Sequence, residues 1–221
     1  MKRKFISAFI LSCTISLMPS QVMAQNQSEA DNTTLFRGVA VSADLIGLGQ
    51  ILWSDYGQYE AGARINLKDK YFPVVEIGYG KCDTEDITTQ NRFKTQAPYF
   101  KLGCDFNVMK NKHDDYRVYV GGRYAFSSYK YDFESNQVID PIWGTNTPFS
   151  QKDISGNCSW LEAGVGIDAK IFGPIRLGWS VRYRQRMNHK EGTSGKAYYV
   201  PGFGKNDTSN IGGTFNVIFE L

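Results

Sequence analysis

Long apolar stretches are missing from the sequence after residue 24. Although 42% of the 221 residues are hydrophobic, no window beyond Ala24 approaches the run of about 18 apolar residues that a membrane-spanning helix requires. This excludes a transmembrane helix from that part of the chain. Histidine is also scarce, with His113 and His189 alone, and there is no phosphate loop, dinucleotide fingerprint or zinc-ligand spacing. We therefore predict no catalytic residues, no cofactor and no metal site.

The N-terminus has the pattern of a secretory signal peptide. Lys2, Arg3 and Lys4 precede an apolar stretch, and Val22-Met23-Ala24 ends it with a small residue. The apolar stretch is interrupted by polar residues and is shorter than the roughly 20 residues of a membrane anchor. We expect residues 1–24 to be a signal peptide cleaved after Ala24, and residues 25–34 to be a flexible N-terminal segment.

A lipoprotein signal is the alternative, because Leu11-Ser12-Cys13 resembles the site at which a cysteine is acylated. The apolar stretch continues past Cys13, which favours ordinary cleavage. Three of the 25 basic residues lie in the first four positions, which leaves 22 against 22 acidic residues. The exported chain is thus formally neutral and has no basic surface that would predict a nucleic-acid partner.

The rest of the chain contains eight segments in which apolar residues alternate with polar residues or glycine, the period of a strand with two different faces. In one of them, Phe100 and Leu102 alternate with Lys101 and Gly103. The segments run over about 35–45, 58–67, 72–81, 99–108, 117–126, 158–172, 175–184 and 210–221. Each is about 10 to 15 residues long, enough to cross an apolar layer about 25 Å thick when tilted.

The connections between these segments alternate in length. Short connections fall at 68–71, 110–115 and 173–174, and long ones at 47–55, 82–96, 131–157 and 188–209. Outer-membrane barrels have short periplasmic turns and longer extracellular loops. The sequence therefore predicts an all-β domain over residues 35–221, a single antiparallel up-and-down eight-stranded transmembrane β-barrel.

Glycine indicates which face of the barrel is inside. Many glycines share the polar parity, where a solvent-facing strand would gain nothing from them, whereas a narrow lumen filled with long charged side chains needs bare backbone. Buried charges persist only when they are paired, which predicts a polar, plugged lumen with a mixed charge network. Its expected members are Asp44, Glu60, Arg64, Glu76, Lys101, Asp105, Arg117, Arg123, Glu162, Asp168, Arg176 and Arg182. The alternative is a soluble, lipocalin-like carrier of apolar ligands, with the apolar parity inside.

The last segment carries Phe215, Val217, Phe219 and Leu221 on one parity. This resembles the C-terminal strand signal by which the barrel-assembly machinery recognises outer-membrane barrels, which usually ends on an aromatic residue. Over residues 25–221 the chain resembles small eight-stranded outer-membrane barrels of the OmpA/OmpX type. Stretches 71–80 and 119–124 are similar to an uncharacterised family of such barrels. The resemblance implies an outer-membrane location and contact with membrane lipids, and implies no established activity.

We accordingly expect a non-enzymatic barrel whose long outer loops, above all 131–157 and 188–209, contact surface glycolipid or a protein partner. A lipid-modifying hydrolase is the enzymatic alternative, with His189, Glu191 and Ser194 at the outer rim; a narrow channel is another. His113 and the acidic run 83–86 fit solvated connections better than an ion site.

The three cysteines after residue 24 form an odd set. Cys104 has the outward parity and should remain a thiol. Cys82 and Cys158 both lie at the top of their segments with inward parity. A disulfide between them is an open alternative, opposed by the distance between their strands.

Overall fold

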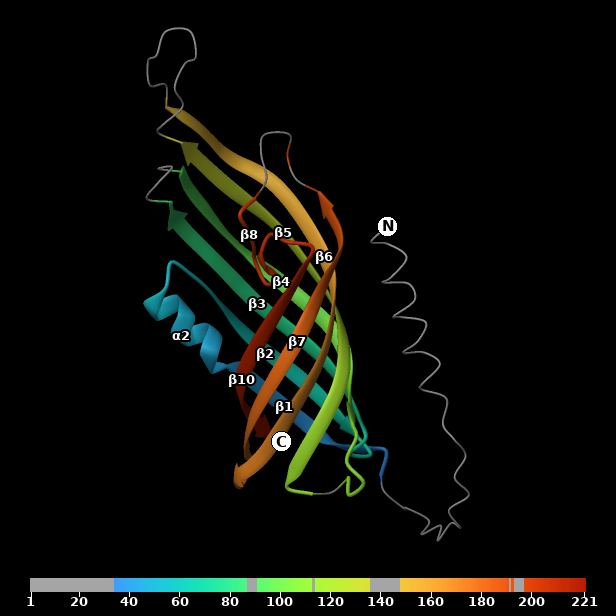
Figure 1. Ribbon diagram of the computed structural model, residues 1–221. Helices are drawn as coiled ribbons and strands as arrows, with labels where there is room; N and C mark the ends of the chain where they lie inside the picture. The colour runs from blue at the N-terminus through green and yellow to red at the C-terminus, as the bar shows by residue number, and fades with distance from the viewer. Residues whose placement is uncertain (1–33, 87–90, 113, 136–147, 191, 193–196) are drawn as a thin grey trace. The chain divides into compact units, whose positions relative to one another are not determined.

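Eight strands close into a ring in the computed structural model, which describes residues 34–221 except 87–90, 113, 136–147, 191 and 193–196. The order around the ring is β1-β10-β7-β6-β5-β4-β3-β2, and every neighbouring pair is antiparallel (Figure 1). The bounds are β1 Phe36–Asp44, α2 Leu45–Trp53, β2 Tyr56–Leu67, β3 Tyr71–Glu85, β4 Asn91–Asn107, β5 Tyr116–Ser135, β6 Phe149–Phe172, β7 Ile175–Lys190, β8 Tyr199–Val200, β9 Gly204–Lys205 and β10 Ser209–Glu220. The predicted all-β, up-and-down barrel is confirmed in this part of the chain.

The two faces of the wall differ in the way the alternation predicts. On β4, Phe100 and Leu102 point outward and are 47% and 55% exposed, whereas Lys101 between them is fully buried. On β6, Val165 and Ile167 are likewise exposed. We call these exposed side chains the apolar belt; its members include Val41, Ile65, Val75, Ile77, Phe106, Val120, Tyr124, Leu161, Trp179, Val181 and Phe219. A soluble carrier with its apolar faces inside is therefore wrong for this chain.

The short turns lie at one end of the ring, which we call the lower end. Residues 68–70 join β2 to β3, and Gly173 and Pro174 alone join β6 to β7. The turn fits in two residues because Gly173 takes a positive φ of 53°, which costs glycine little. The C-terminus pairs at this end, where Glu220 faces Ala40 of β1. Figure 1 shows β5 and β6 rising well beyond β1 at the opposite, upper end.

The strands are longer than predicted at the upper end. Inward and outward positions continue to alternate there, but the inward side chains are apolar and the outward ones polar. Tyr129 and Tyr131 of β5 are 3% and 2% exposed, whereas Lys130 between them is exposed. The expected connections 82–96 and 131–157 were thus too long, since β3 continues to Glu85, β4 begins at Asn91, and β5 and β6 run to Ser135 and from Phe149. Here the wall is polar outside and aromatic inside, the reverse of the belt.

A buried cluster fills the upper end, and we call it the upper core. Its members are Cys82, Phe93, Ala97, Tyr99, Ala125, Tyr129, Tyr131, Cys158, Trp160, Ala197, Tyr199, Val200 and Phe203. The chain of β8 and β9 lies inside it: Phe203 is fully buried and its ring meets that of Trp160 at 5.6 Å, edge to face. The predicted connection 188–209 therefore includes a two-stranded hairpin that folds onto the strands rather than a free outer loop.

The predicted connection 47–55 is also wrong in part, because residues 45–53 form the helix α2. Asp44 caps the helix, its carboxylate accepting hydrogen bonds from the amides of Ile46 and Gly47 at 3.2 Å each. Such a cap satisfies amides that have no partner within the helix. The helix packs beside β2, so closely that a Cβ at Gly47 would collide with the carbonyl of Gln58. No helix in the described part of the chain is long and apolar enough to cross a membrane.

Candidate functional site

The centre of the barrel is a cluster of buried, paired charges built from opposite sides of the wall. Lys101 on β4 lies between two carboxylates, with its Nζ 2.7 Å from Glu60 on β2 and 3.1 Å from Glu162 on β6. None of the Lys101 side chain is exposed. An unpaired ammonium group would be very costly here, so the two carboxylates are what allow a lysine at this position.

Two arginines extend this cluster towards the lower end. Arg182 on β7 donates to both carboxylate oxygens of Glu76, at 2.9 and 3.0 Å, and to Glu60 at 3.2 Å. Arg123 on β5 then donates to Glu76 at 3.0 Å and to Asp105 at 2.8 Å. Forked arginine–carboxylate pairs are the strong, geometrically specific kind. The whole cluster therefore joins six strands, β2 to β7, across the lumen as well as around the wall.

A second cluster lies closer to the short turns and is centred on Asp168. Arg64 and Arg176 donate to separate oxygens of Asp168, at 2.6 and 2.7 Å. The hydroxyl of Tyr119 donates to the same carboxylate. Arg117 pairs with Glu220 of the last strand at 2.6 Å. The lower cluster thus joins residues of β2, β5, β6, β7 and β10.

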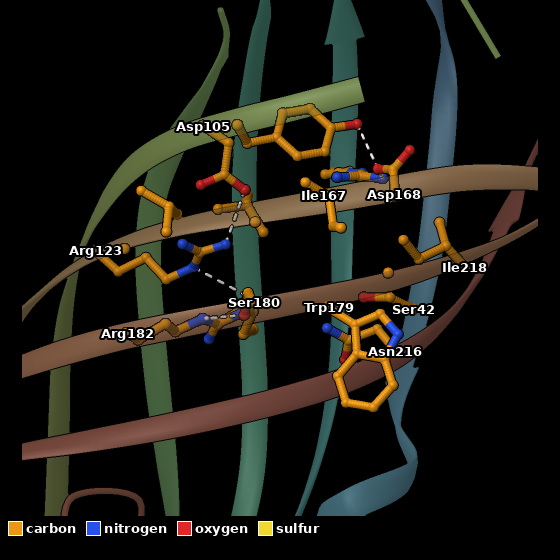
Figure 2. Close-up of a pocket in the computed structure, with 18 residues that line it drawn as sticks. Ser42, Asp105, Arg123, Ile167, Asp168, Trp179, Ser180, Arg182, Asn216 and Ile218 are labelled. Atoms are coloured by element: carbon orange, nitrogen blue, oxygen red, sulfur yellow. Dashed lines mark hydrogen bonds and ion pairs between the residues drawn. The ribbon is translucent and has the colours of Figure 1, made fainter. Parts of the chain in front are cut away.

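Between the clusters lies a cavity of about 60 Å³, lined by charged and small polar side chains together with apolar ones such as Val74 and Ile218. Figure 2 shows Arg123 and Arg182 on one side of it and Asp168 on the other, with Ser180 and Asn216 beneath. A polar space of this size suits a few water molecules. It is too small for a lipid or sugar ligand, which typically needs about 300 Å³ or more.

The narrow lumen depends on bare backbone at close contacts between strands. A Cβ at Gly121 would collide with the Asp105 carboxylate, and one at Gly78 with the ring of Tyr99. Both glycines have the polar parity, as the sequence argument for the inner face required. Long charged and aromatic side chains of the neighbouring strands occupy the space that any residue larger than glycine would need at these two positions.

The structure brings together all the predicted lumen charges except Asp44. Its carboxylate caps α2 and also accepts a 3.1 Å hydrogen bond from the amide of Phe215, so its partners are backbone groups rather than cations. Sequence reasoning missed several partners: Tyr99, Tyr119, Trp160, Arg184, Asp69 and Glu220. Most of them have the same parity as their charged neighbours, so the alternation could have identified them.

The predicted rim trio is described only in part. His189 lies at the upper end of β7, with Nε2 3.4 Å from the Tyr129 hydroxyl and Nδ1 3.4 Å from Arg186. Glu191 and Ser194 lie outside the described residues, as does His113, so the hydrolase alternative is untested.

Asp83, the first residue of the acidic run 83–86, is paired with an arginine of the same chain. Arg92 donates twice to Asp83, at 3.1 and 3.2 Å, and this lowers the pKa of that carboxyl. Asp83 is therefore already balanced by a cation. Among the described residues, no three His, Cys, Asp or Glu side chains are grouped to hold a metal ion.

The three described cysteines form no disulfide. Cys82 and Cys158 are both in the upper core, whereas Cys104 lies on the outer face of β4. The open alternative of a bond between Cys82 and Cys158 is thus not realised in this structure, and Cys104 is a thiol as predicted.

A closed antiparallel ring of eight strands, with an apolar outer wall and a charged interior, defines a β-barrel of the outer-membrane type. The chain belongs to the family described as "Domain of unknown function (DUF6048)", whose model matches residues 1–220. This confirms the predicted membership of an uncharacterised barrel family. No curated protein matches the chain.

Several solved structures are similar to the chain at low sequence identity. Ail, the attachment invasion locus protein of Yersinia pestis, crystallised with the heparin analogue sucrose octasulfate, is 10% identical, with 83% of this chain and 93% of that one covered and a TM-score of 0.38. Neisserial surface protein A is 15% identical over 85% and 98% of the two chains, with a TM-score of 0.43. A major outer membrane protein from Thermus thermophilus is 14% identical over 83% and 98%, with a TM-score of 0.47.

Proposed function

We propose that this protein is a non-enzymatic outer-membrane barrel with a plugged lumen, whose upper end is a rigid binding surface for surface glycolipid or a protein partner. In this proposal residues 1–24 direct export and are removed after Ala24, residues 25–34 form a flexible segment, and residues 35–221 form the barrel. The C-terminal strand with Phe215, Val217, Phe219 and Leu221 is the part that the barrel-assembly machinery recognises.

One observation carries the proposal: the polarity of the strands inverts along their length. Lower on β5, Tyr124 and Phe126 point outward and Arg123 points inward. Higher on the same strand, Lys130 points outward and Tyr129 and Tyr131 point inward. An apolar outer wall suits hydrocarbon, and a polar outer wall around an apolar core suits water. The inversion therefore supports a barrel whose belt lies in the bilayer and whose upper end projects into water.

The ion-paired lumen supports a plug rather than a channel. Lys101, Arg182, Glu60 and Glu162 are all at most 7% exposed, and the upper core lies above them. A conducting pore needs a continuous path of water, which this arrangement opposes. A binding role fits better than transport, because the strands hold the upper end in place while its outer face is polar and accessible.

The membrane placement is tested with two cysteine variants in intact Gram-negative cells. Lys130→Cys should react with a membrane-impermeant maleimide on whole cells, because this side chain is 66% exposed on the projecting end. Lys70→Cys, in the turn between β2 and β3, should react only after lysis. Wild-type protein is the control, since Cys82 and Cys158 are buried and Cys104 faces the belt. Recovery of the protein in a detergent-free soluble fraction, or the opposite labelling pattern, would reject the proposal.

The binding role needs a separate measurement on purified protein. Lipopolysaccharide is the probe for surface glycolipid, and co-sedimentation of the detergent-solubilised barrel with its aggregates is the readout. The double charge reversal Lys130→Glu and Lys152→Glu should weaken binding if the outer face of β5 and β6 is the contact surface. A barrel that fails to co-sediment would leave a protein partner as the remaining form of the proposal.

A further inference from the structure

The ring has a place where one strand ends earlier than its neighbours. The last pairs of β1 join Ala43 to Ala61 of β2 and Asp44 to Asn216 of β10. Above them, β2 continues as 56–60 and β10 as 209–215 without β1 between them. These are two strand edges at the upper margin of the belt. Open strand edges carry backbone groups that require polar partners, above all next to hydrocarbon.

The helix α2 covers part of this opening and leaves a groove beside it. The groove has a volume of about 410 Å³. It is lined by Gln50 of α2, Tyr56 and Gln58 of β2, Arg184 of β7, Tyr198, Tyr199, Gly204 and Lys205 of the β8–β9 hairpin, and Asn210, Ile211, Gly212 and Gly213 of β10. Unlike the small lumen cavity, it has the volume of a ligand site.

The charged side chains that line the groove are all positive. Arg184 and Lys205 are its ionisable cations, and no carboxylate is among the described residues that line it. The Arg184 side chain is only 6% exposed, and its guanidinium lies against bare backbone, since a Cβ at Gly212 would be 2.9 Å from Nη2. The Arg184 Nη1 donates to the Phe203 carbonyl at 3.0 Å, whereas its Nε, 3.2 Å from Glu162, is in no hydrogen bond in the described structure.

The groove is also continuous with the apolar belt. Ile211, on β10, is 71% exposed and faces outward in line with Phe219 and Tyr183. The helix beside the groove has no charged residue, and its Leu48 and Trp53 are 43% and 88% exposed. Exposed apolar helices with tryptophan are typical of the membrane interface.

We propose that this groove binds a lipid of the surrounding leaflet whose phosphate headgroup carries a net negative charge, with the phosphate towards Arg184 and Lys205 and the acyl chains along Ile211 and the exposed side of α2. The proposal rests on the proposed placement of the belt in a membrane. The cations and the side-chain amides of Gln50, Gln58 and Asn210 supply donors to phosphate oxygens. The glycines of β10 leave the room that the lipid needs.

Native mass spectrometry of the purified barrel in detergent tests this directly. The probes are dioleoyl phosphatidic acid, dioleoyl phosphatidylcholine and inorganic phosphate. We expect phosphatidic acid to be retained about tenfold more than phosphatidylcholine, the factor that one charge-assisted hydrogen bond provides. Inorganic phosphate should neither bind nor displace the lipid. Equal retention of the two lipids would overturn the proposal, and so would displacement by free phosphate, which would indicate an anion site without a lipid.

A matched pair of glycine variants locates the site. Gly213 and Gly122 are both exposed on the outer face, and a Cβ at either would have a carbonyl 3.7 Å away as its nearest neighbour. Gly213→Leu fills the groove and should reduce phosphatidic acid retention several-fold, about as much as losing one anchoring contact. Gly122→Leu, on the fully paired wall of β5, should not. Lys205→Gln should reduce the preference for phosphatidic acid and leave phosphatidylcholine retention unchanged.

Equal effects of the two leucine variants would overturn the location, provided that both still show the heat-dependent gel mobility of a folded barrel. This result is distinct from failure of the membrane placement. A barrel that labels on whole cells as proposed but retains no phosphatidic acid would reject the groove alone.

Discussion

The indole Nε1 of Trp160 donates a 2.8 Å hydrogen bond to Oε1 of Glu162. The indole is fully buried in the upper core, and the carboxylate is a member of the lumen charge cluster with Lys101 and Arg182. This contact, and the hydrogen bond that the Tyr99 hydroxyl of the upper core donates to Glu60, join the aromatic upper end to the charged barrel below it. The two regions should therefore unfold together rather than in separate steps.

Trp160→Phe tests this link, because it keeps a ring in the upper core and removes the donor. Glu162 would lose one hydrogen bond in a buried place, and we expect a loss of about 1 to 3 kcal/mol of stability. The matched control is Trp179→Phe, on the outer face of β7 and 57% exposed. Urea titration followed by the heat-dependent gel shift measures both. Equal stability of the two variants would show that the bond between Trp160 and Glu162 does not couple the two regions.

The central charges should be strongly coupled, unlike those on the upper surface. Glu76→Ala leaves Arg123 and Arg182 without a shared carboxylate in the lumen, and we expect a loss of about 3 to 5 kcal/mol. The comparison is Lys130→Ala, whose partner Asp153 is 3.4 Å away with both side chains mostly exposed; its cost should be below about 1 kcal/mol. Similar costs for both substitutions would indicate a hydrated pore, a result that conductance in a planar bilayer would check.

Charge on the apolar belt should be far more harmful than charge above it. Leu102→Arg puts a cation on the outer face of β4, where we expect a cost of about 2 to 4 kcal/mol in a bilayer. Ser128→Arg, outward on β5 where the wall is polar, is the matched control and should assemble normally. Thermal stability in lipid vesicles and recovery from the outer-membrane fraction measure the difference. Normal assembly of Leu102→Arg would reject the position of the belt.

The sequence predicted the ring and the lumen well because both follow from strand alternation. Side chains of one parity share a face whatever their exact partners, so Lys101 and Glu76 could be placed inside without a structure. Their pairing could not be predicted, because Arg182 meets Glu76 across the barrel rather than along one strand. Which charges meet depends on strand tilt and register, and neither is encoded in local alternation.

The errors at the upper end have a different physical origin. Tyr129, Lys130 and Tyr131 alternate as clearly as the belt does, but with polar and apolar sides exchanged, because the solvent changes from hydrocarbon to water. Predicting one parity for a whole strand therefore ended β5 too early. The hairpin of β8 and β9 is held by long-range packing around Phe203, which no local pattern of its short strands could indicate.

Asp44 shows where parity is insufficient, and it provides the last prediction. Its inward position is compatible with an ion pair, yet its carboxylate accepts from the amides of Ile46, Gly47 and Phe215. Asp44→Ala should therefore destabilise α2 and the adjacent edge of β10, at a cost of about 1 to 2 kcal/mol for the lost helix cap. Asp44→Ser should recover part of this, because a hydroxyl also caps helices. Hydrogen–deuterium exchange gives a specific readout: faster exchange in peptides covering 45–53 and 211–216, with the peptide of the central β4 strand unchanged. A uniform increase over the whole barrel would instead place Asp44 in the lumen charge network.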